Sequence, residues 1–117
     1  MVILAGHDTN LSNLSGMLDV SWRVPGQVRD DTPPESALIF SLWREGARGE
    51  WLVKLEFVTP SLDQMRRLQP LTLDSPPARV PVAIPACGSP RADAGCPWPA
   101  FRAAIQKAID PKFTDML

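Results

Sequence analysis

The sequence has one histidine, two cysteines and no long apolar run among its 117 residues. A lone histidine distant from two cysteines is not the usual ligand set of a zinc site, so we expect no bound metal and no cofactor. Without an uninterrupted apolar stretch, no membrane span is indicated. Any mechanism that requires a second histidine must obtain it from another polypeptide.

An excess of charge of one sign is also lacking. Twelve basic and thirteen acidic residues leave a net charge of −1, and no basic stripe is present. Because proteins that bind a phosphate backbone usually carry such a stripe, nucleic acid is not an expected partner. Hydrophobic residues make up 44% and charged residues 21% of the chain, which is close to the average of soluble globular proteins. The length allows one small domain.

The periodicity of apolar residues predicts an α/β fold. Residues 2–6 form an apolar run that predicts a short strand buried on both faces. A helix should follow, with Thr9 or Asn10 as its N-cap. The order β-α-ββ-α-β-α indicates a mixed sheet with flanking helices. The remaining expected elements are a hairpin over 37–44 and 50–58, a short helix from Ser61, an irregular edge strand over 79–86 that is interrupted by Pro81 and Pro85, and a last helix from about Pro97.

The four tryptophans each lie in an apolar pattern. They could be mistaken for a platform that stacks sugars or bases, but core packing is the better interpretation of Trp22, Trp43, Trp51 and Trp98.

The segment Gly6-His7-Asp8-Thr9-Asn10 directly follows the first apolar run. A strand that turns into a helix presents backbone N–H groups and the positive end of the helix dipole, which together suit a phosphate or carboxylate. His7 could donate to an anionic oxygen, and Asp8 could protonate a leaving group. Since the dipole favours an ionised carboxylate, such an acid would act mainly below neutral pH. The alternative is a first-turn Asp beside a capping His, without function.

The two cysteines, Cys87 and Cys96, bracket a loop rich in turn formers. The loop suits a local disulfide in an oxidising compartment, with two free thiols as the alternative. The N-terminus has no basic region before its apolar residues and so no signal peptide. A disulfide would therefore indicate a C-terminal piece of a longer exported protein.

Several blocks together resemble the C-terminal portion of histidine acid phosphatases, in the bacterial branch of periplasmic phytases and glucose-1-phosphatases. The resemblance covers nearly the whole chain. It rests on residues 5–10 (AGHDTN), 22–27 (WRVPGQ), 31–34 (DTPP), 38–40 (LIF), 43–44 (WR) and 64–66 (QMR), on the Pro76-Pro77 turn, and on the spacing of Cys87 and Cys96.

This resemblance implies a phosphoglycerate-mutase-like fold and hydrolysis of phosphomonoesters through a phosphohistidine intermediate. In the family, a histidine of an Arg-His-Gly-x-Arg-x-Pro motif attacks phosphorus, arginines hold the phosphate, and a His-Asp motif supplies a phosphate contact and the general acid. Carried over, His7 contacts the phosphate and Asp8 is the proton donor. Thr9 and Asn10 would line the substrate pocket, and Thr9 favours phytate over glucose-1-phosphate. The cysteine pair would form a disulfide.

The main departure is that the chain contains no Arg-His-Gly. Residues 1–117 are therefore expected to be the C-terminal segment of the domain, without the nucleophile-bearing N-terminal part. The intact enzyme would be periplasmic or secreted and act on a phosphorylated small molecule, whereas the isolated chain would be inactive. A sheet cut off at residue 2 would expose an edge that another copy could cover. The alternative function is a non-catalytic remnant that binds phosphate or another protein.

Overall fold

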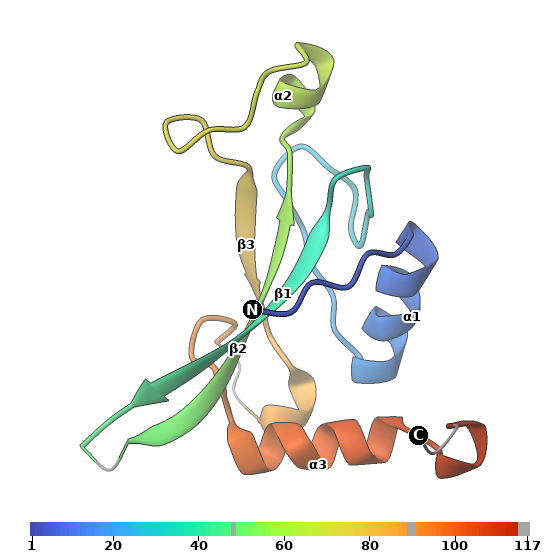
Figure 1. The fold of residues 1–117 in the computed structure, drawn as a ribbon, viewed down its shortest axis with the longest axis vertical. Helices are drawn as coiled ribbons and strands as arrows, with labels where there is room; N and C mark the ends of the chain where they lie inside the picture. The colour runs from blue at the N-terminus through green and yellow to red at the C-terminus, as the bar shows by residue number, and fades with distance from the viewer. Residues whose placement is uncertain (48, 89–90, 115–117) are drawn as a thin grey trace.

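Strand β2, Glu50–Thr59, is the central strand of the sheet in the computed structural model. It pairs with β1, Ala37–Glu45, along one edge, and with β3, Ala78–Val82, and β4, Cys96–Pro97, along the other (Figure 1). All three pairings are antiparallel. The structure describes residues 1–47, 49–88 and 91–114.

The alternating pattern of β2 determines which face of the sheet is buried. Val53, Leu55, Phe57 and Thr59 are buried, whereas the residues between them are only half-buried. Side chains of successive strand residues point to opposite faces, so one apolar row is enough to build a core on one side. The predicted hairpin is therefore confirmed, and β1 begins and ends within one residue of the expected range.

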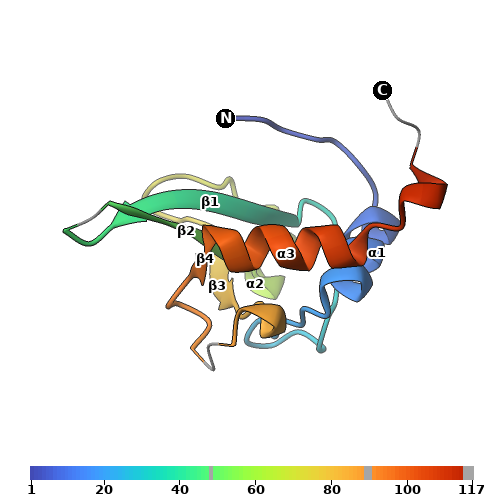
Figure 2. The ribbon, with the colours of Figure 1, turned by 90° about the horizontal axis from the view of Figure 1, so that it is seen from below.

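Helices cover the buried face. Helix α1, Asp8–Leu18, and helix α3, Trp98–Ala108, contact each other, and Figure 2 shows α3 lying beside the sheet. The short helix α2, Leu62–Arg66, begins after Ser61 as expected, because the Ser61 hydroxyl accepts from the Gln64 backbone N–H. No helix in the described part of the chain is long and apolar enough to cross a bilayer. Two single-turn 3₁₀ helices complete the structure, η1 over Pro85–Cys87 and η2 over Pro111–Phe113.

Trp22 connects the loop after α1 to the sheet. Its ring stacks on Phe57 with a centroid distance of 4.5 Å and an interplanar angle of 13°. The indole N–H donates to the Asp31 carbonyl, and the Asp30 carboxylate accepts from the Trp22 backbone N–H. The prediction that Trp22 is a core residue is confirmed, and the loop is ordered by these bonds.

The prediction for the other tryptophans is wrong. Trp43, Trp51 and Trp98 are 51%, 46% and 43% exposed. Trp43 and Trp51 lie on the part of the hairpin beyond the β3 ladder, where Lys54 and Arg44 stack over their rings. Apolar periodicity identifies a face that can be buried, but it does not show whether this chain covers that face.

The expected first strand is not formed. Residues 2–6 are extended and exposed, and no described strand pairs with them. The α/β class is confirmed, but all strand pairs that the structure describes are antiparallel, so the sheet is not mixed. An isolated strand has no partner for its N–H and C=O groups, and nothing in the described residues supplies one here.

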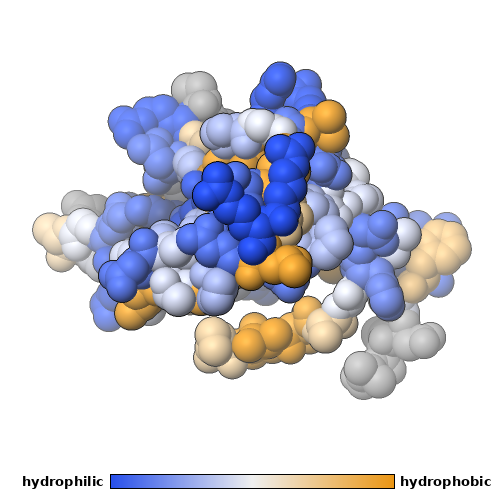
Figure 3. Space-filling view, turned by 90° about the horizontal axis from the view of Figure 1, so that it is seen from above, coloured by the Kyte–Doolittle hydropathy of each residue, from blue (hydrophilic) through white to orange (hydrophobic). Residues whose placement is uncertain are grey.

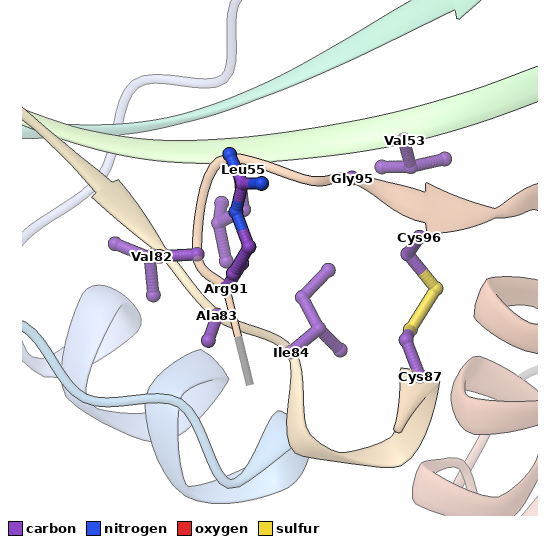
Figure 4. A pocket seen from close by; sticks show the side chains of 10 residues that line it. Val53, Leu55, Val82, Ala83, Ile84, Cys87, Arg91, Gly95 and Cys96 are labelled. Atoms are coloured by element: carbon purple, nitrogen blue, oxygen red, sulfur yellow. A yellow bond between two sulfur atoms is a disulfide. The ribbon is translucent and has the colours of Figure 1, made fainter. Parts of the chain in front are cut away.

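The predicted disulfide is formed. Cys87 of η1 and Cys96 of β4 are bonded, with their Cα atoms 5.4 Å apart (Figure 4). The bond ties the end of β3 to β4 across the bottom of the core, where Val53 and Ile84 are buried. The small cavity beside it has a volume of about 10 Å³, which is about the volume that one water needs.

The molecule is more open than a complete domain of its length. Its radius of gyration is 15.6 Å, whereas a domain of 117 residues typically has about 13 Å. Its accessible surface is 8905 Å², against about 6,300 Å² for a folded monomer of 12.8 kDa. A large part of the surface is therefore of the kind that complete domains bury.

We predict that replacing both Cys87 and Cys96 by alanine lowers the free energy of unfolding by about 2–3 kcal/mol, since the bond closes a loop with a sequence separation of 9. Urea titration of oxidised wild type and of the double variant measures the difference. Equal midpoints and slopes would contradict the prediction.

Candidate active site at the start of α1

The turn from residues 2–6 into α1 places the four predicted site residues next to one another. His7 is the N-cap, with φ −120° and ψ 172°, and Asp8 is the first helical residue. The expected N-cap at Thr9 or Asn10 is wrong by two or three residues. The imidazole and the carboxylate consequently stand at the positive end of the helix dipole, where an anion is favoured.

Two hydrogen bonds to side chains and one between backbone groups hold this turn. The Asn10 Oδ1 accepts from the His7 backbone N–H at 2.8 Å, and the Asp8 Oδ1 accepts from the Thr9 backbone N–H at 2.7 Å. The His7 carbonyl also accepts from the Asn10 N–H at 3.0 Å. Asp8 thus satisfies one of the N–H groups that every helix start leaves without an intrahelical partner.

Gly6 is required by the position of the Asn10 amide. A Cβ on residue 6 would lie 2.8 Å from Asn10 Oδ1, closer than carbon and oxygen atoms normally approach. Gly6 and Asn10 therefore fit together beneath His7. That Asn10 lines a substrate pocket stays a prediction, and its oxygen in addition holds the His7 backbone. The signal for this role was its spacing, three residues after the N-cap, which is that of a capping box.

The site is open to solvent. His7, Asp8, Thr9 and Asn10 are all exposed. None of them lines the cavity beside the disulfide or the 400 Å³ hollow next to α2. Binding pockets normally bury most of a ligand, so this exposed turn cannot enclose a ligand by itself.

Arginines are the other side chains suited to a phosphate, and two of them are engaged locally. Arg44 stacks over Trp51 and donates from Nε to the Gly49 carbonyl. Arg67 pairs with Asp63 on α2. Arg48 lies outside the described residues. Within the part of the chain that is described, no group of three or more His, Cys, Asp or Glu residues could hold a metal ion.

The arrangement can perform two operations on an anionic substrate. A neutral or protonated imidazole at His7 can donate to a phosphate oxygen. A protonated Asp8 can give its proton to an adjacent oxygen. The turn holds no nucleophile beyond these groups and no arginine, so it does not complete a hydrolytic site by itself.

Similarity to known phosphatases extends along nearly the whole chain. No family model matches it. It is 36% identical over 111 residues to phytase AppA of Escherichia coli, covering 95% of this chain and 26% of that protein. It is 36% identical over 90 residues to glucose-1-phosphatase of Salmonella typhimurium, covering 74% of this chain and 21% of that protein.

Similarity extends to the structure. The phytase from Citrobacter braakii matches with a TM-score of 0.81 and 39% identity, over 92% of this chain and 27% of that one. The chain thus spans about a quarter of the length of the relatives it matches.

We predict that Asn10→Ala speeds hydrogen exchange of the His7 amide by about fivefold, because loss of a capping bond costs about 1 kcal/mol. Asn10→Asp keeps an acceptor oxygen at the same place and should retain the protection. Heteronuclear NMR of the labelled chain measures both rates. The role of Asn10 as a cap would be wrong if both variants exchanged like the wild type.

Proposed function

We propose that this chain, which belongs to the histidine acid phosphatases in their branch of bacterial phytases and glucose-1-phosphatases, supplies the phosphate contact and the general acid of a phosphomonoesterase. The observation that carries the proposal is the His7-Asp8 pair, held at the N-terminus of α1 by Asn10. The reaction, the substrate and the partners are those of the whole enzyme, of which this chain would be one part.

The reaction would proceed in two steps. A histidine outside this chain attacks phosphorus, the bond from phosphorus to the leaving oxygen breaks, and Asp8 gives that oxygen a proton. Water then attacks the phosphohistidine, and the Asp8 carboxylate takes a proton from the water as phosphate is released. Splitting the hydrolysis in this way replaces one difficult step by two easier ones.

His7 and Asp8 would have separate duties. His7 would contact a phosphate oxygen in both steps, together with the dipole of α1, and so stabilise charge on the transferring group. Asp8 would act only on the leaving oxygen and the attacking water. Its exposed position at the first turn allows a substrate to reach it directly.

The substrate class would be phosphorylated small molecules such as phytate or sugar phosphates. Thr9 and Asn10 would line the substrate pocket, and the Asn10 oxygen would also hold the turn beneath it. The intact enzyme would be periplasmic or secreted, because the Cys87–Cys96 disulfide suits an oxidising compartment. The isolated chain, which lacks the nucleophilic histidine and the arginines of the Arg-His-Gly-x-Arg-x-Pro motif, would not turn over phosphomonoesters.

A second candidate is a non-catalytic phosphate-binding or interaction module. The observation behind it is that the exposed His7-Asp8 turn can contact a phosphate without any covalent chemistry. The two candidates differ in whether the chain can take its place in an active enzyme, so a graft distinguishes them.

We predict that a chimera with this chain in place of the matched segment of the E. coli phytase is active, whereas the isolated chain is not. In the chimera, Asp8→Asn should lower kcat/KM for an alkyl phosphate by about 10²–10⁴, and far less for p-nitrophenyl phosphate. An aryl leaving group departs without a proton. His7→Ala should weaken both substrates alike, since a phosphate contact serves either.

Asp19→Asn, the same substitution at the exposed C-cap of α1, is the matched control and should change neither rate. Equal losses on both substrates for Asp8→Asn would mean that Asp8 positions the substrate and is not the proton donor. An inactive chimera that folds would favour the non-catalytic module.

A further inference from the structure

Different hydrogen bonds hold the two side chains that the proposed reaction uses. The Asp8 carboxylate accepts from the backbone N–H of Thr9, the next residue along the chain. His7 is held through its backbone instead: its carbonyl accepts from N–H groups of α1, and its N–H donates to Asn10 Oδ1 at 2.8 Å. A change at the Asn10 side chain therefore acts on His7 and leaves the bond that holds Asp8 in place.

Gly6 leaves the room that the Asn10 amide needs. The φ of Gly6 is not positive, so the backbone conformation at this position does not require glycine. A Cβ on residue 6 would lie 2.8 Å from Oδ1, 3.2 Å from Cγ and 3.3 Å from Cβ of Asn10. Figure 3 shows the apolar strip of residues 1–5 clear of the body of the molecule, so the crowding at Gly6 comes from Asn10.

Gly6 and Asn10 together enclose the backbone of His7. One residue precedes His7 and the other follows it by three positions, and their close fit sets where the His7 N–H points. The imidazole leaves the same residue, so its direction depends on this backbone. A contact that is displaced by about 1 Å can lose a large part of its catalytic effect, and the direction of the imidazole consequently matters for a phosphate contact.

We propose that Asn10 is a positioning residue of the proposed reaction, which directs the His7 imidazole to the phosphate through the His7 backbone N–H, with Gly6 as the residue that makes room for it. This rests on the proposed function, in which His7 contacts phosphate and Asp8 protonates the leaving oxygen. Because Asn10 acts through His7, its effect is the same for every leaving group. A direct contact of Asn10 with the substrate would not depend on the imidazole, and this difference can be measured.

The test measures kcat/KM of the chimera with an alkyl phosphate and with p-nitrophenyl phosphate. Asn10→Ala should lower both values by about fivefold, the factor expected for loss of a capping hydrogen bond. In the His7→Ala chimera the same substitution should cost less than about twofold, because no imidazole is left to position. Asn13→Ala is the matched control: Asn13 is exposed on α1, its side chain bonds to no described residue, and both rates should stay unchanged.

Gly6→Ala tests the same unit from its other side. The added methyl group displaces the Asn10 amide, so both kcat/KM values should fall by about fivefold, as for Asn10→Ala. In the Asn10→Ala chimera the amide is absent, and Gly6→Ala should cost less than about twofold more. In the isolated chain, Gly6→Ala should also speed hydrogen exchange of the His7 amide, which is a readout that does not depend on activity.

Three results would overturn the positioning role. Equal losses from Asn10→Ala with and without the His7 imidazole would mean that Asn10 contacts the substrate or only stabilises the fold. A loss confined to the alkyl phosphate would mean that Asn10 acts through Asp8. An active chimera with the same kcat/KM for Asn10→Ala, Asn13→Ala and the wild type would leave Asn10 without a role in turnover.

The wild-type chimera tests the proposed function separately. If it folds and is inactive, the proposed function fails and the role of Asn10 in turnover fails with it. If it is active and Asp8→Asn and His7→Ala behave as expected, any of the three results above overturns the role of Asn10 alone.

Discussion

The stack of Trp22 on Phe57 connects the two parts of the molecule that matter for function. Phe57 is 0% exposed on the central strand, and Trp22 belongs to the loop that follows α1. The loop is therefore held against the sheet at a fixed point, and α1 packs beside it through Leu18. The His7-Asp8 turn is positioned relative to the sheet through this chain of contacts.

Most local structure could be predicted from the sequence. Alternation identified the buried face of β2, Ser61 marked the start of α2, and the turn formers between Cys87 and Cys96 indicated their disulfide. These features depend on contacts between residues that are all present in the chain. The patterns that specify them are local or nearly so.

The predictions that are wrong share a physical cause. Residues 2–6 have the composition of a buried strand, yet they are exposed. Three tryptophans that lie in apolar patterns are exposed as well: Trp43, Trp51 and Trp98. An apolar pattern shows that a surface can be buried, whereas its burial depends on residues that the pattern does not contain. The sequence predicted a helix start within residues 7–10, which is confirmed, but it placed the N-cap two or three residues too late, and so the role of Asn10 as a cap on His7 was missed.

The central claim is the proposal that His7 and Asp8 form one half of a phosphatase site whose nucleophilic histidine lies outside residues 1–117. The most direct measurement is to quench the chimera with the E. coli phytase during turnover of a ³²P-labelled phosphomonoester, at alkaline pH, and to map the labelled peptide. The account predicts phosphohistidine in the part contributed by the E. coli phytase and none on His7. Label on His7, the single histidine here, would contradict it.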